Sequence, residues 1–97
     1  MRPQARAHAF RGLARLRAGR VREALEDLDL AVKLGPVGPL APMTWKLRGL
    51  ARAQADDVVG AIADLRRYVD LQPPGPWDAS VAEAKASLDE LVARLKR

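Results

Sequence analysis

Apolar residues recur at intervals of three and four along most of the chain, the spacing that places them on one face of an α-helix. The first such run starts near Ala7 and ends at Gly19, and the second starts at Val21 and stops at Gly35-Pro36. Glycine commonly ends a helix, and proline cannot continue one. The pattern therefore predicts two helices joined by a tight turn.

The same pattern returns 37 residues later. Residues 8–36 align with residues 45–73 without a gap, and 13 of the 29 aligned positions are identical. The pentapeptide Arg-Gly-Leu-Ala-Arg occurs at Arg11–Arg15 and again at Arg48–Arg52. Self-similarity at such a period is typical of helical repeat proteins, so we expect a second helical hairpin.

The turn of this second hairpin is expected at Ala55-Asp56-Asp57. Asp56 stands where Gly19 stood, and aspartate enters the left-handed backbone conformation more readily than most residues. We expect Asp56 to adopt that conformation and its carboxylate to cap the helix that follows.

A last amphipathic run follows the Pro-rich stretch 73–76. Asp78 and the box Ser80-x-x-Glu83 are signals for the start of a helix. The apolar stripe consists of Val81, Ala84, Leu88, Leu91, Val92 and Leu95. The ends of helical repeat arrays need a helix with a polar outer face, so we expect this one to cover the second hairpin.

The two units resemble the tetratricopeptide repeat family, whose pattern is Trp-x2-Leu-Gly-x2-Tyr, then Ala-x3-Phe, then Pro. The matching residues are Gly12, Ala24, Leu28 and Pro36 in the first unit and Trp45, Gly49, Ala61, Leu65 and Pro73 in the second. The departures are His8 for the Trp, Arg11 and Arg48 for the Leu, and Arg15 and Arg52 for the Tyr. The resemblance implies that Gly12, Ala24, Gly49 and Ala61 lie where two helices approach closely.

The resemblance and the periodicity together predict an all-α, tetratricopeptide-like superhelix of five helices in one domain spanning residues 1–97. The expected parts are repeat 1 at about 5–36, a connector at 35–42, repeat 2 at about 42–73 and a capping helix at about 78–96. Eighteen Ala, fourteen Leu and thirteen Arg give the chain a helix-forming composition.

Little in this sequence supports catalysis. There is no Cys, one His and one Tyr, and the lone His8 is expected to pack where the family prefers an aromatic residue. We therefore expect no enzyme activity, no catalytic residues, no cofactor and no metal site. The longest run without a charge, 34–45, is too short to span a membrane, and we expect a cytoplasmic protein.

Positive charge is concentrated at one end. Residues 1–22 hold seven Arg and no acidic residue, within a chain of net charge +5. Three interpretations remain open: nucleic-acid binding, attraction of an acidic protein, and a face whose charges are solvated or paired within the molecule.

The resemblance implies a function in protein–protein interaction, because the first helix of each hairpin lines a concave, peptide-binding groove in this family. The corresponding residues here are Arg6, Ala9, Leu13, Leu16, Arg17, Lys46, Leu50, Ala53 and Gln54. The apolar members predict anchoring contacts, and Arg6, Arg17 and Lys46 predict a basic rim that steers an acidic partner.

We therefore expect a partner protein or peptide that is acidic and carries apolar anchors, with a second copy of the chain as another occupant. The alternatives are a basic nucleic-acid-associated module and a structural accessory domain of a larger enzyme. The last of these is suggested by a loose similarity of residues 66–73 and the following helix to the tail of bacterial transglutaminase-like proteins.

Overall fold

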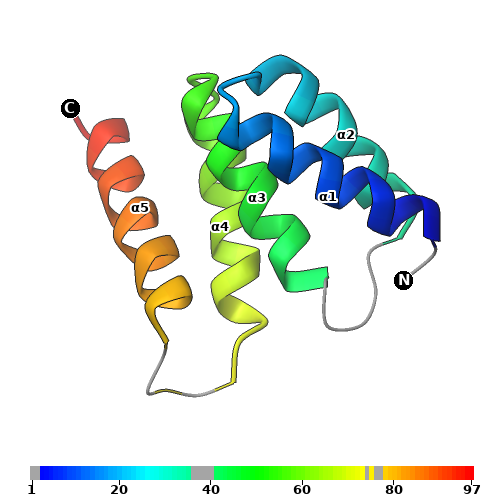
Figure 1. The fold of residues 1–97 in the computed structure, drawn as a ribbon. Coiled ribbons are helices and arrows are strands. Elements are labelled where there is room, and N and C mark those ends of the chain that lie inside the picture. Colours follow the sequence, from blue (N-terminus) through cyan, green and yellow to red (C-terminus); the bar gives the residue numbers. More distant parts are fainter. Residues whose placement is uncertain (1–2, 36–40, 74, 76–77) are drawn as a thin grey trace.

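The fold consists of two helical hairpins and a terminal helix (Figure 1). The computed structural model describes residues 3–35, 41–73, 75 and 78–97, and these residues form five helices and no strand. The helices are α1 (Pro3–Arg17), α2 (Val21–Lys33), α3 (Ala41–Gln54), α4 (Val58–Asp70) and α5 (Ala79–Leu95). The expected all-α fold of five helices is confirmed. Most of the predicted connector, 36–40, lies outside the described residues, as do Pro74 and Pro76.

The two hairpin turns have the same backbone geometry. Gly19 and Asp56 both take positive φ angles, of 79° and 66°, as the alignment of the repeats predicts. The carbonyl of Arg15 accepts a hydrogen bond from the amide of Arg20, and the carbonyl of Arg52 accepts the equivalent bond from Asp57, each at 2.8 Å. These bonds satisfy carbonyls that have no partner within the helix.

The residue that caps α4 is Asp57, and our assignment of this role to Asp56 is wrong. The Oδ1 atom of Asp57 accepts a hydrogen bond of 3.0 Å from the amide of Gly60. The left-handed conformation of Asp56 directs its carboxylate elsewhere, and Oδ1 accepts a bond of 2.8 Å from Arg94. Asp56 therefore ties the end of α5 to the turn between α3 and α4.

Small residues allow the two helices of each hairpin to pack closely. A Cβ atom added at Gly12 would lie 2.8 Å from Cγ of Leu28, and one added at Gly49 would lie 2.8 Å from Cγ of Leu65. The neighbouring Ala24 and Ala61 are also fully buried. The expected close helix contacts are confirmed at Gly12 and Gly49, and the burial of Ala24 and Ala61 agrees with the same expectation.

Helix α5 packs on α4 in the register in which α3 packs on α2. A shift of 37 residues carries Thr44, Leu47 and Ala51 of α3 onto Val81, Ala84 and Leu88 of α5, and all six are buried. Asp78 begins α5 by accepting a hydrogen bond of 3.0 Å from the amide of Val81. Helix α5 thus has the position of the first helix of a third hairpin, and Figure 1 shows it at the end of the array.

Candidate functional site

The first helices of the two hairpins enclose a hollow of about 350 Å³, and the start of α5 closes one side of it. Its lining consists of Leu13, Leu16 and Arg17 of α1, Met43, Lys46, Leu47 and Leu50 of α3, and Ser80 and Glu83 of α5. The apolar members lie together, because positions three and four apart share one face of each helix. An apolar floor with a few charged groups around it is the usual composition of a ligand site.

A smaller hollow of about 80 Å³ continues the first one toward the start of α1. Its lining consists of Ala9, Phe10, Leu13, Met43, Thr44 and Leu47, three of which also line the larger hollow. Phe10 and Met43 are 49% and 45% exposed. We call the two hollows together the α1–α3 groove.

Lys46 forms part of the groove wall and is held by α5. It is only 8% exposed, and Nζ donates hydrogen bonds of 2.8 Å to Oγ and 3.0 Å to the backbone oxygen of Ser80. The nearest carboxylate oxygen, Oε1 of Glu83, is 3.8 Å away. The charge of Lys46 thus links the second hairpin to the terminal helix. We predicted Ser80 as part of a helix-start box, but its hydroxyl accepts the hydrogen bond from Lys46. The residue that caps α5 is Asp78.

Arg17 lies at the edge of the groove, and Arg6 lies near its other end. Both are exposed, and neither forms an ion pair within the described part of the chain. The guanidinium of Arg6 lies over the ring of Phe10, 5.6 Å from its centre. These two cations can interact with an incoming ligand.

Other arginines of α1 are bound to a buried aspartate. Asp27 of α2 is 1% exposed and accepts hydrogen bonds of 2.7–3.1 Å from Arg11 and one of 2.7 Å from Arg15. Nδ1 of His8 lies 3.4 Å from the same carboxylate. Burial alone would raise the pKa of Asp27, but the hydrogen bonds and charge of Arg11, together with the charge of Arg15, hold this pKa below its usual range.

The second hairpin contains the same cluster 37 residues later. Asp64 accepts hydrogen bonds of 2.9 and 3.0 Å from Arg48 and of 3.1 Å from Arg52. Arg48 also donates to Asp29 of the first hairpin at 3.3 Å, so it joins the two hairpins. Burial acts to lower the pKa of Arg48, and the hydrogen bonds and charges of Asp64 and Asp29 raise it above its usual value.

Internal ion pairs reduce the positive charge that residues 1–22 present to a partner. Arg11 and Arg15 are paired with Asp27, and Arg20 is paired with Glu23. The charge of residues 1–22 is therefore partly paired within the molecule. This was one of the three interpretations that the sequence left open. A phosphate backbone would have to compete with these carboxylates for the same guanidinium groups.

The structure places the predicted site residues in three different surroundings. Leu13, Leu16, Arg17, Lys46 and Leu50 line the larger hollow, and Ala9 lines the smaller one. Arg6 borders Phe10. Ala53 is half-buried against the core of the second hairpin, and Gln54 is exposed; neither lines a described hollow.

Sequence reasoning missed six groove residues, which are Phe10, Met43, Thr44, Leu47, Ser80 and Glu83. The repeat contained the signal for one of them, because a shift of 37 residues carries Arg6 onto Met43. Nothing in the periodicity indicates that the start of α5 would form a wall of the groove.

Among the described residues, no three His, Cys, Asp or Glu side chains lie close enough together to hold a metal ion. None of the described helices is long and apolar enough to cross a membrane. In comparisons with known proteins, the family model described as Tetratricopeptide repeat matches residues 2–39 and 11–76. No curated protein and no solved structure matches the chain.

Proposed function

Because the chain belongs to the tetratricopeptide repeat family, whose members generally mediate protein–protein interactions and are typically non-catalytic, we propose that its α1–α3 groove binds a peptide segment of a partner protein. The single observation that carries this proposal is the row of accessible apolar side chains along the groove. Phe10 and Met43 remain about half exposed there, above the half-buried Leu13, Leu16 and Leu50. Contiguous exposed apolar surface is typical of an interface.

The charges at the edge of the groove support a partner segment with acidic residues. Arg6 and Arg17 have no ion pair within the described residues, whereas the ammonium of Lys46 is held by Ser80. We therefore assign the attraction of an acidic segment to Arg6 and Arg17. Exposed charges at the edge of an interface act mainly on the rate of association, and apolar anchors act mainly on the rate of dissociation.

A ligand can be obtained by selecting binders from a random peptide display library, followed by measurement of association and dissociation rates. Met43→Ala is the test of the apolar floor, because Met43 is exposed enough to be truncated without opening the core. Leu30→Ala is its matched control, since Leu30 is 42% exposed and lies on α2, outside the groove. We expect Met43→Ala to weaken binding by more than about 1 kcal/mol, mainly through faster dissociation, and Leu30→Ala to leave binding unchanged.

Arg17→Ala tests the charged edge, with Arg22→Ala on the exposed face of α2 as its control. We expect Arg17→Ala to slow association of an acidic peptide and to flatten its dependence on salt. Selected peptides that bind Met43→Ala and Arg17→Ala as tightly as the unchanged protein would place their site outside the groove and refute the proposal.

A further inference from the structure

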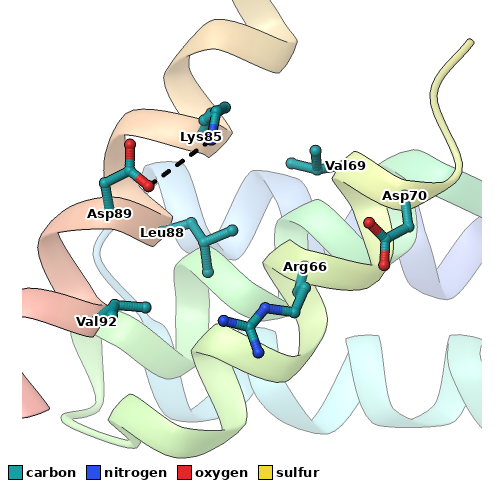
Figure 2. A pocket seen from close by; sticks show the side chains of 7 residues that line it. All are labelled: Arg66, Val69, Asp70, Lys85, Leu88, Asp89 and Val92. Atoms are coloured by element: carbon teal, nitrogen blue, oxygen red, sulfur yellow. Dashed lines mark ion pairs between the residues drawn. The ribbon is translucent and has the colours of Figure 1, made fainter. Parts of the chain in front are cut away.

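A second hollow lies between α4 and α5 (Figure 2) and has a volume of about 440 Å³. Its floor is apolar and consists of Val69, Leu88 and Val92. Figure 2 shows Arg66 and Asp70 on the α4 side and Lys85 and Asp89 on the α5 side. Lys85 and Asp89 form an ion pair of 3.9 Å, whereas Arg66 and Asp70 form none within the described residues.

The internal repeat shows what covers the equivalent surface of α3 in the second hairpin. Moving back by 37 residues carries Lys85 and Asp89 of α5 onto Arg48 and Arg52 of α3. In the second hairpin, those two arginines bind Asp64 of α4, so the corresponding surface is covered by a helix. The two helices of a hairpin with a short turn run antiparallel. The hollow is therefore the place for one more helix, lying antiparallel to α5.

A helix like α2 or α4 does not fit this place. The position of Gly49 is occupied in α5 by Ala86, and a Cβ at Gly49 would lie 2.8 Å from Cγ of Leu65. A leucine equivalent to Leu65 would meet the same obstacle at Ala86. An acidic residue equivalent to Asp64 would face Lys85 where Asp64 faces Arg48, but it would also face the like charge of Asp89 where Asp64 faces Arg52. The occupant must be a helix with small residues and without a buried acidic group opposite Asp89.

Helix α5 itself meets these requirements when a second copy supplies it. Its outer face has the exposed small residues Ala82, Ala86 and Ala93. Two α5 helices packed antiparallel are related by a two-fold axis, which is the usual symmetry of a homodimer. With that axis near Ser87, Lys85 of each copy lies opposite Asp89 of the other.

The charges of the hollow favour this occupant over an acidic partner. Arg66, Asp70, Lys85 and Asp89 sum to zero on a chain whose net charge is +5, so this face lacks the positive field of α1. The Lys85–Asp89 pair within one helix joins side chains that are 47% and 69% exposed, and exposed pairs of this kind contribute little. Both groups can exchange this contact for one between two copies.

We propose that two copies of this chain associate through the α4–α5 face, each placing α5 antiparallel to the other in the hollow. This interface is on a different surface from the α1–α3 groove and is independent of the function proposed for the groove. Lys85 and Asp89 form its reciprocal ion pairs, and Val69, Leu88 and Val92 form its apolar centre.

Sedimentation equilibrium over a concentration series up to the millimolar range tests the proposal on the full chain. We expect Lys85→Asp and Asp89→Lys each to weaken self-association by about tenfold or more, because each places like charges across the axis. The double variant Lys85→Asp/Asp89→Lys restores opposite charges and is expected to dimerise. A mixture of the two single variants is expected to form heterodimers more tightly than either variant associates with itself.

Arg22→Asp and Glu26→Lys on the exposed face of α2 are the matched controls, since they change the net charge by the same amounts. They are expected to dimerise as the unchanged protein does, and circular dichroism checks that every variant is folded. Unchanged protein that stays monomeric throughout the series overturns the proposal, whether or not the face binds another protein. Single variants that dimerise as tightly as the unchanged protein, or single variants that do not associate more tightly when mixed, also overturn it.

Discussion

The buried aspartates of the two hairpins offer a test of how much the ionic clusters stabilise this fold. Asp27→Asn and Asp64→Asn keep the size of the side chain and remove its charge. Each aspartate accepts hydrogen bonds from two arginines, so each replacement removes the nearest carboxylate of two cations. Arg15, Arg48 and Arg52 each keep a more distant or more exposed carboxylate, which belongs to Glu23, Asp29 and Asp57 respectively. Because the two sites are related by the internal repeat, each one serves as the comparison for the other.

The expected cost differs with the exposure of the arginines left behind. The side chain of Arg11 is 54% exposed and can be solvated by water, whereas that of Arg48 is 14% exposed. Removing one partner of a buried ion pair costs about 3–5 kcal/mol when the remaining charge stays buried, and a lost hydrogen bond to a charged group costs about 1.5–3 kcal/mol. Arg48 also keeps its contact with the exposed Asp29, which reduces this cost. We expect about 2 kcal/mol for Asp27→Asn and about 3 kcal/mol for Asp64→Asn, a large fraction of the stability of a small domain.

Urea unfolding followed by circular dichroism measures both costs and their dependence on pH. The pKa of Asp27 is lower in the folded protein than in the unfolded chain, where it is about 3.9. Its contribution is therefore complete above about pH 5 and is lost as the pH falls through 3.9 toward the lower folded value. The difference in unfolding free energy between unchanged protein and Asp27→Asn must shrink on acidification. A difference that does not change with pH, or a smaller cost at Asp64 than at Asp27, would refute the reasoning.

Two further predictions concern packing. Gly49→Ala is expected to destabilise the protein by about 1–2 kcal/mol, because its Cβ meets the fully buried Leu65 at 2.8 Å. The cost is expected to be smaller in a Leu65→Ala background, where the contact with Cβ of Asp64 at 3.2 Å remains, and thermal unfolding of the four proteins checks the difference. A chain that ends at Gly75 lacks α5 and exposes the apolar face of α4, so it is expected to aggregate or to lose cooperative unfolding. A soluble and equally stable fragment would contradict the packing of α5 on α4.

The architecture of this protein could be predicted from its sequence because the same pattern of two helices and a turn occurs twice. Helix periodicity identified the runs, and the 37-residue shift placed Gly12 with Gly49 and Ala24 with Ala61. Those pairs proved to be the close contacts between helices. The cap of α4 was missed because Asp56 and Asp57 are adjacent and chemically identical. Only the backbone conformation decides which carboxylate reaches the amide of Gly60.

The groove was less predictable because a wall of it comes from outside the repeats. Leu13 and Leu50 could be assigned from the helix face, since they occupy the same position in two aligned helices. Ser80 and Glu83 lie in α5, and their place beside Lys46 depends on how α5 packs on α4 and brings its first turns beside α3. Such a contact between distant segments leaves no periodic trace in the sequence.

The aligned arginines and aspartates explain why charge alone misleads in this chain. The seven arginines of residues 1–22 suggest a surface for nucleic acid. However, Asp27 and Asp64 occupy equivalent positions in the two repeats, and so do the arginine pairs that bind them. A repeated opposite-charge pattern between the two helices of a hairpin indicates internal pairing, because both partners return at every period. Arg6 and Arg17 have no such partner in the described residues, and Arg17 reaches the groove. Of the arginines that the structure describes in residues 1–22, Arg6 and Arg17 therefore combine an unpaired charge with a place beside the apolar groove, whereas the unpaired Arg22 lies on α2 outside it.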